Sequence, residues 1–227
     1  MKKHTKMTAM VALVSLLVMI LSGCSSEQKD TVTVPEPIMT AVPADPAVPA
    51  ELPATEQGTG MLDGERFEDV IMLEGMEETV RYEHVRNDGI GIEMDYDYEQ
   101  FIRKSESGRE FFVSRYDSSE NPVNYLEVTY SAESAESVAA AVGTALSQDY
   151  AVNPAPYTLG KAGNCIRIDA SSTPDGQTPD LLQMVYIVPA GQGCVVAISH
   201  YSFEGADGFG TRIAKMMDSL VIIGKNN

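Results

Sequence analysis

Three acidic side chains alternate along a short stretch of the chain and could converge on a metal ion. They are Asp95, Asp97 and Glu99, within the sequence Glu-Met-Asp-Tyr-Asp-Tyr-Glu. Calcium prefers several oxygen ligands, and carboxylates supply them. The stretch lacks the glycine and the closing glutamate of an EF-hand loop, since position 100 is Gln. Ca²⁺ binding is therefore one hypothesis, and a solvated face at the end of a strand is the other.

Patterns of catalytic residues are sparse. The chain has no Gly-x-Ser-x-Gly elbow, no His-Glu-x-x-His, no Walker loop and no Cys-x-x-Cys. We expect His84 to be a half-exposed strand residue. Cys194 and His200 are six residues apart on one predicted strand, hence about 20 Å apart and unable to form a catalytic pair. An enzymatic site built from residues such as Asp169, His200 and Glu204 stays open as an alternative.

Cys165 and Cys194 are the two cysteines of the predicted folded domain. A disulfide between them would suit a secreted protein. In a meander their strands flank a third strand, Leu181–Val188, so they lie about two strand spacings of ~4.8 Å apart, beyond the usual Cα limit of about 7 Å. We expect two buried free thiols, and a different strand order would allow the disulfide.

A glycine-bearing segment from Gly205 to Gly210 opens the last predicted helix. Its backbone N–H groups could receive an anion. A dinucleotide site would need a preceding parallel strand, which the hairpin-rich pattern does not offer. We expect a strand-to-helix turn here.

The elements that position these residues follow from the periodicity of the apolar side chains. Strands are predicted over Val70–Leu73, Thr79–Val85, Ile90–Met94, Phe111–Tyr116, Tyr125–Tyr130, Asn164–Ala170, Leu181–Val188 and Cys194–Tyr201. Between the third and fourth of these, Asp97 to Lys104 is predicted as a short helix or an irregular crossover.

Two amphipathic helices are predicted. The first starts after Ser131, a candidate N-cap, and Gly143 within it costs about 1 kcal/mol relative to Ala unless something packs closely there. Its apolar stripe is Val138, Ala141, Val142, Ala145 and Leu146. The second runs from about Asp207 to Leu220, with a stripe of Phe209, Ile213, Met216, Met217 and Leu220. A central antiparallel sheet covered by helices would bury both apolar stripes, so the predicted fold class is α+β.

The N-terminus has the features of an exported and lipid-anchored protein. Lys2, Lys3 and Lys6 precede an apolar run from Met10 to Leu21, which is too short for a comfortable membrane span of about 18–20 residues and fits a signal peptide. The run ends in Leu21-Ser22-Gly23-Cys24, which resembles the lipobox of bacterial lipoproteins. That resemblance implies cleavage after residue 23, diacylglycerol on the Cys24 thiol, and a fatty acid such as palmitate on the new amino terminus. An ordinary cleaved signal with a coincidental cysteine is the alternative.

A proline-rich tether follows the proposed lipidation site and ends at about residue 60. It contains half of the chain's 12 prolines, namely Pro35, Pro37, Pro43, Pro46, Pro49 and Pro53. Such segments form semi-rigid polyproline II spacers of about 3.1 Å per residue, so residues 25–60 could reach on the order of 100 Å. The predicted organisation is a signal peptide (1–23), a lipidated tether (24–60) and one folded domain (61–227).

Between about residues 88 and 223, the chain has the helix at Ser131–Asp149, a three-strand meander after it, and the closing sequence Met216-Met217-Asp218-Ser219-Leu220-Val221-Ile222. This order of elements resembles the PsbP-like family, which includes small bacterial lipoproteins. It implies an α/β/α sandwich, and it specifies no catalytic residues. Residues 61–87 have no counterpart there and are predicted to form an added hairpin.

Charge limits the class of partner. The chain has 16 Lys and Arg against 33 Asp and Glu, a net charge of −17, and loss of the three lysines in residues 1–23 would leave the mature chain at −20. Nucleic acid is excluded, because such binding depends on cationic neutralisation of phosphates, and so is a polybasic membrane-surface role.

The sequence therefore predicts a lipid-anchored extracytoplasmic binding or accessory protein without catalytic activity. It would be held to the cell membrane through Cys24 and would interact with a protein or a small ligand at the cell envelope. No cofactor is expected, apart from the Ca²⁺ hypothesis at Asp95, Asp97 and Glu99. The alternatives are an envelope enzyme and a Ca²⁺-binding surface protein.

Overall fold

The computed structural model describes residues 60–224, except positions 74, 107, 119 and 173–179. The predicted signal peptide, Cys24 and nearly all of the tether lie outside these residues. Within the described part of the chain, no helix is both long enough and apolar enough to cross a bilayer.

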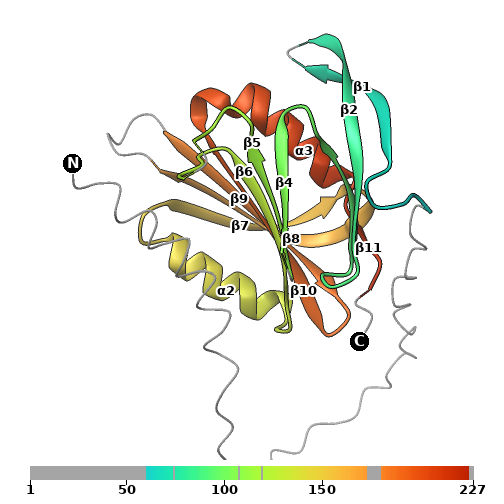
Figure 1. Ribbon diagram of the computed structural model, residues 1–227. Helices are drawn as coiled ribbons and strands as arrows, with labels where there is room; N and C mark the ends of the chain where they lie inside the picture. The colour runs from blue at the N-terminus through green and yellow to red at the C-terminus, as the bar shows by residue number, and fades with distance from the viewer. Residues whose placement is uncertain (1–59, 74, 107, 119, 173–179, 225–227) are drawn as a thin grey trace, which may run out of the picture. The chain divides into compact units, whose positions relative to one another are not determined.

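Two antiparallel sheets make up most of the described chain (Figure 1). The small sheet has the order β1-β2-β3-β11, with β1 (Arg66–Leu73), β2 (Met76–Asn87), β3 (Ile92–Asp97) and β11 (Val221–Ile222). The large sheet has the order β4-β5-β6-β10-β9-β8-β7, with β4 (Phe101–Glu106), β5 (Arg109–Ser114), β6 (Tyr125–Ser131), β10 (Gly193–Ser202), β9 (Leu181–Ala190), β8 (Gly163–Ser172) and β7 (Ala151–Leu159). The predicted α+β class is confirmed, and the second sheet is a feature that the sequence did not reveal.

Among the described residues, one α-helix packs on the large sheet and another on the small sheet. Helix α2 (Ala135–Leu146) contacts β7, β8 and β9. Helix α3 (Thr211–Asp218) contacts β3 and follows a π-helical turn, Ala206–Gly210. Short 3₁₀ turns occupy Gly160–Ala162 and Phe203–Gly205. The segment Gly205–Gly210 is thus a strand-to-helix connection, as expected.

The main hydrophobic core joins both sheets and α3. The rings of Tyr96 on β3 and Phe112 on β5 pack with centroids 5.0 Å apart. From α3, the side chains of Ile213, Met216 and Met217 are fully buried in the same cluster. The remaining members of the predicted stripe, Leu220 and Phe209, also pack there. Helical periodicity therefore identified the buried face of α3 correctly.

Helix α2 begins later than the sequence indicates. Its N-cap is Ser134, whose hydroxyl accepts a hydrogen bond from the Ser137 N–H, whereas Ser131 is the last residue of β6 and pairs with Cys194. The prediction of Ser131 as N-cap is wrong because pairing with β10 holds the chain in the sheet through that residue. Nothing lies within 4 Å of a methyl group placed on Gly143, so no close contact compensates for that glycine.

The segment Asp97 to Lys104 is neither a helix nor a crossover. Asp97 ends β3, and a tight turn leads into β4, which pairs with β5 as a hairpin. Arg103 and Ser105 on β4 both donate hydrogen bonds to the carboxylate of Glu110 on β5. These polar pairs make β4 difficult to recognise in the sequence, because they bury charged groups where a sheet normally buries apolar groups. Residues 61–87 do contain the predicted hairpin, formed by β1 and β2.

Strand β7 was not predicted. It contains Pro154 and Pro156, and proline is confined to sheet edges because it cannot donate to the ladder. Among the described residues, β7 is an edge strand of the large sheet and pairs with β8 alone. In an antiparallel pair the N–H groups point alternately toward and away from the partner. Both prolines, two residues apart, therefore remove N–H groups from the open side of the strand.

Candidate functional site

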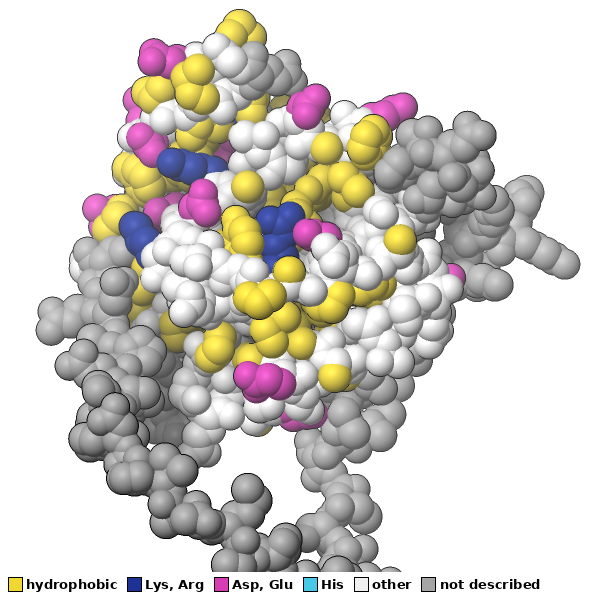
Figure 2. All heavy atoms as spheres, turned by 180° about the vertical axis from the view of Figure 1, so that it is seen from behind, with side chains coloured by type: hydrophobic (Ala, Val, Ile, Leu, Met, Phe, Trp, Pro, Cys, Tyr) yellow, Lys and Arg dark blue, Asp and Glu magenta, His cyan; other side chains and the backbone are white. Residues whose placement is uncertain are grey.

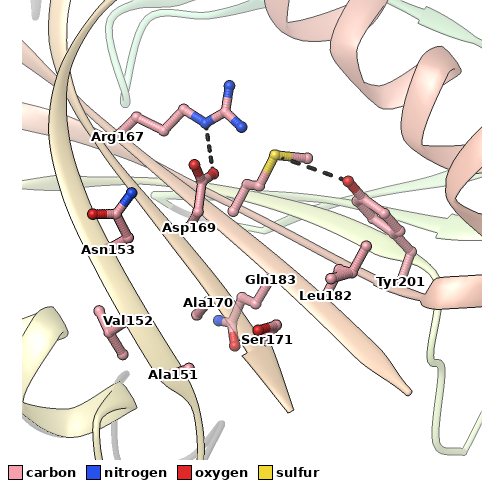
Figure 3. Close-up of a pocket in the computed structure, with 11 residues that line it drawn as sticks. Ala151, Val152, Asn153, Arg167, Asp169, Ala170, Ser171, Leu182, Gln183 and Tyr201 are labelled. Atoms are coloured by element: carbon pink, nitrogen blue, oxygen red, sulfur yellow. Dashed lines mark hydrogen bonds and ion pairs between the residues drawn. The ribbon is translucent and has the colours of Figure 1, made fainter. Parts of the chain in front are cut away.

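An open groove of about 510 Å³ lies over the strands β7, β8, β9 and β10 (Figure 3). Strand register explains which side chains face it. Asn153, Asp169 and Met184 are aligned across three strands, and the next aligned row contains Ala151, Ser171, Leu182 and Tyr201. Because alternate residues of a strand point to opposite faces, both rows project from the same side of the sheet.

Arg167 and Asp169 form the charged part of the groove. They lie two residues apart on β8 and share its face, and Arg167 Nε donates to Asp169 Oδ1 over 2.6 Å (Figure 3). The guanidinium lies over the ring of Tyr157 at 5.0 Å and near that of Tyr186 at 5.8 Å. Partial burial lowers the pKa of Arg167, but the hydrogen bond with Asp169 and the neighbouring groups outweigh it, and the pKa is raised overall. The hydrogen bond and the two rings fix the orientation of the Arg167 guanidinium.

The floor of the groove is apolar and contains a sulfur atom bound by two phenols. The hydroxyls of Tyr186 and Tyr201 donate to the Met184 sulfur over 3.8 and 3.9 Å. Burial raises the pKa of Tyr186 to about 12 and also raises that of Tyr201. Both phenols are therefore neutral near pH 7 and hold Met184 in place. Leu182 completes the floor beside Met184.

The residues of the enzyme hypothesis are not brought together. Asp169 faces the groove. Ser199 is aligned with Asp169 through Met184 and shares its face of the sheet. His200 is the next residue on the strand and therefore points to the other face. There its ring stacks on Tyr125 with centroids 5.2 Å apart, and Nδ1 lies 2.6 Å from the Val123 carbonyl oxygen. Glu204 lies in the 3₁₀ turn after β10.

His200 makes stability depend on pH. Burial lowers the pKa of this imidazole from 6.5, and the hydrogen bond to the Val123 carbonyl offsets only part of that effect. The unfolded chain therefore takes up the proton first as pH falls, so stability is lost from about pH 6.5 downward until the folded-state pKa is passed. We expect His200→Gln to remove this component, so that the difference in unfolding free energy between wild type and variant narrows between about pH 7.5 and pH 5 in urea titrations. A difference independent of pH would contradict this account.

The two cysteines are free and buried, as predicted. The strand β9 separates β8 and β10, which carry them. The register also places the two cysteines on opposite faces of the sheet. Cys194 shares a face with Val196 and Ile166. Cys165 directly precedes Ile166 on β8, so its side chain points to the other face. Burial raises the pKa of both thiols to about 11, so neither is a ready nucleophile. Cys194 and His200 share a strand face, six residues apart on β10, as expected.

The three carboxylates of the Ca²⁺ hypothesis pair with three different cationic or basic side chains. Asp95 Oδ1 lies 2.7 Å from Nδ1 of His84, and Asp97 Oδ2 lies 2.5 Å from Nη1 of Arg212. Glu99 pairs with Arg81 at 2.8 Å. Within the described ranges, no group of three or more His, Cys, Asp or Glu side chains is arranged to hold a metal.

Two expectations for this region were wrong. His84 is buried, with 1% of its side chain exposed, and lies between Asp95 and Glu93. Asp97 is also buried, with 2% exposed, rather than part of a solvated face. In both cases a polar side chain from another element contacts the buried group, and sequence spacing does not show such partners.

The groove itself was missed, although β8 carried a signal for it. Arg167, Asp169 and Ser171 alternate with Ile166, Ile168 and Ala170, so one face of β8 is polar although both neighbours in the sheet are strands. Asn153 joins this face only through the pairing of β7 with β8.

One face of the molecule carries few clustered charges. Figure 2 shows one face of the molecule, on which hydrophobic side chains occupy much of the centre and charged side chains are scattered among them.

Comparisons with known proteins assign the chain to no family. No protein-family model matches the chain, and no curated protein matches it. Among solved structures, it is similar to the solution structure of cyanobacterial PsbP (CyanoP) from Synechocystis sp. PCC 6803, with 12% identity, 75% of this chain and 99% of that chain covered, and a TM-score of 0.42. The α+β class itself follows from the strand pairing and helices described above.

Proposed function

We propose that this chain is a lipid-anchored extracytoplasmic binding protein that acts without catalysis, and that the groove over β7–β10 holds its ligand. The groove, with its fixed Arg167–Asp169 pair, is the observation that carries the proposal. Its volume of about 510 Å³ falls within the range of about 300–1,000 Å³ typical of small-ligand sites. A few convergent polar groups over an apolar floor are also typical of such sites.

The proposed anchor places this groove outside the cytoplasm. A lipidated Cys24 would carry more than one acyl chain, and two chains give stable membrane attachment where one is marginal. The proline-rich segment would then act as a spacer between the membrane and the domain.

Cys24→Ala tests the anchor. We expect the variant to leave the membrane fraction, either as released protein or as unprocessed precursor, because the thiol that receives the diacylglycerol is absent. Fractionation followed by mass spectrometry of the mature N-terminus measures both outcomes. Normal processing together with membrane retention would refute the lipoprotein assignment.

Blocking the groove tests the binding role. Ala151 is exposed and lines the groove, so Ala151→Trp would fill it. Ala140→Trp is the matched control, because Ala140 is exposed on α2 and is not among the residues that line the groove. We expect a soluble envelope extract to raise the melting temperature of the wild type and of Ala140→Trp, by mass action, but not that of Ala151→Trp. Equal shifts in all three proteins, or no shift in any, would overturn the proposal.

A further inference from the structure

We infer that the groove takes a neutral, hydroxyl-rich ligand, specifically a short oligosaccharide. This inference rests on the proposed function, because it assumes that the groove is the binding site. It follows from the charge of the lining, from the kind of hydrogen-bonding groups that it presents, and from the apolar floor between them.

The charge of the lining favours a neutral ligand. Among the described lining residues, the acidic and basic side chains are Asp169 and Arg167, and they offset each other across a 2.6 Å contact. An anionic ligand on Arg167 would compete with Asp169 and would face a chain of net charge −17. A cationic ligand on Asp169 would compete with Arg167. A neutral ligand can hydrogen-bond to both groups without separating them.

The polar groups present planar pairs of donors and acceptors in one row. Asn153 and Asp169 are directly opposite each other on β7 and β8, and Arg167 is held beside them. Within the described chain the hydrogen bond of Arg167 uses only Nε, which leaves its terminal N–H groups to a ligand. Neighbouring hydroxyls on a sugar ring both donate and accept, so they suit adjacent amide, carboxylate and guanidinium groups.

The rigidity of the Arg167 side chain strengthens its match to a sugar. The guanidinium is stacked on Tyr157 and held by Asp169, so little side-chain entropy remains to be lost when a ligand binds. Arginine is suited to this role because its planar donors have a fixed geometry, whereas a lysine would present a single flexible ammonium group.

The floor complements the carbon-bound faces of a sugar. Leu182 and Met184 are partly exposed in the groove, and Tyr186 and Tyr201 fix the Met184 sulfur. Sugar rings and N-acetyl methyl groups present apolar C–H surface that can be buried there. An open groove, rather than an enclosed cavity, also allows the ligand to continue beyond the site as a chain.

Titration of defined sugars into the full-length protein in detergent tests the inference. We use the neutral trisaccharides triacetylchitotriose and cellotriose, with the anionic trigalacturonate and the zwitterionic dipeptide alanyl-alanine as competing chemistries. We expect a neutral trisaccharide to bind, Arg167→Met and Arg167→Lys to weaken it at least about tenfold, Ala151→Trp to abolish it, and Ala140→Trp to leave it unchanged. Unchanged melting temperatures of the variants without ligand establish that they are folded.

Failure of the oligosaccharide inference and failure of the proposed binding function give different results. Binding of trigalacturonate or alanyl-alanine that Ala151→Trp blocks, without binding of either neutral sugar, overturns the oligosaccharide inference and leaves the proposed binding function standing. No binding of any probe, together with no groove-dependent shift in envelope extract, overturns both. Sugar binding that persists in Ala151→Trp places the site elsewhere and also overturns the inference.

Discussion

Replacing Arg212 by Met is expected to lower the free energy of unfolding by roughly 3–5 kcal/mol, the usual cost of removing one partner from a buried ion pair. Arg212 reaches from α3 to Asp97 of β3 and also to Glu78 of β2. The side chains of Arg212 and Asp97 are 10% and 2% exposed. Without Arg212, the buried carboxylate of Asp97 would keep only the N–H groups of Glu99 and Gln100 as partners.

The loss of stability in Arg212→Met is also expected to depend on pH. Burial already raises the pKa of Asp97 from 3.8, and Arg212 opposes that rise. In Arg212→Met the pKa rises further above its unfolded value, so the folded state binds a proton more readily and gains stability as pH falls. In urea unfolding experiments, the stability difference between wild type and Arg212→Met should therefore narrow as the pH is lowered from neutral toward the ordinary carboxyl pKa of 3.8.

Two further variants separate charge from packing. Lys215→Met on the same helix removes an exposed pair with Asp69, at 4.0 Å, and should cost less than about 1 kcal/mol. Adding Asp97→Asn to Arg212→Met should recover much of the loss, since it removes the unpaired charge. A cost below about 1 kcal/mol for Arg212→Met alone would show that the pair does not hold α3 against the small sheet.

The second large effect is a contrast between two glycines given the same substitution. A methyl group on Gly193 would lie 2.2 Å from the Ser131 carbonyl oxygen and 2.5 Å from the Tyr130 hydroxyl oxygen. The backbone cannot yield there without disturbing the pairing of β10 with β6, so Gly193→Ala should destabilise by about 1–3 kcal/mol or more. In helix α2, Gly143→Ala meets nothing within 4 Å and should stabilise by about 0.5–1 kcal/mol.

Thermal unfolding measures both variants against wild type. For a domain of this size, each kcal/mol corresponds to about 2–4 °C in Tm, so the two substitutions should shift Tm in opposite directions. Shifts of the same sign would contradict either the contact at Gly193 or the open surroundings of Gly143.

Much of the fold was predictable where local periodicity and burial agree. The apolar stripes of α2 and α3 point into the interior as their spacing indicates, and the meander of β8, β9 and β10 has the expected order. The small sheet was not predictable as a sheet of its own, because β11 is only two residues long and returns to pair with β3 from the far end of the chain. Strand β4 was hidden by polar residues whose partner, Glu110, is buried across a hairpin.

The candidate site was less accessible to sequence reasoning than the fold. Asn153, Asp169 and Met184 lie in different strands and meet only through strand register. Spacing along the chain suggested Asp95, Asp97 and Glu99 instead, and it could not show that Arg212, more than a hundred residues away, pairs with Asp97. Sequence patterns identify residues that are close along the chain. The groove and the surroundings of Asp97 both depend on residues that are distant in sequence and close in space.

The two prolines of β7 have a consequence for molecules held side by side. An open strand edge is a template on which another copy can add its own strand. Confinement to a membrane plane by the proposed anchor would bring many such edges into repeated encounter, in effect a far higher local concentration than in free solution. With the outward N–H groups missing at Pro154 and Pro156, strand-by-strand polymerisation along β7 loses two of its hydrogen bonds. Self-association along the edge that borders the groove is thereby weakened, which would favour an accessible groove on a crowded surface.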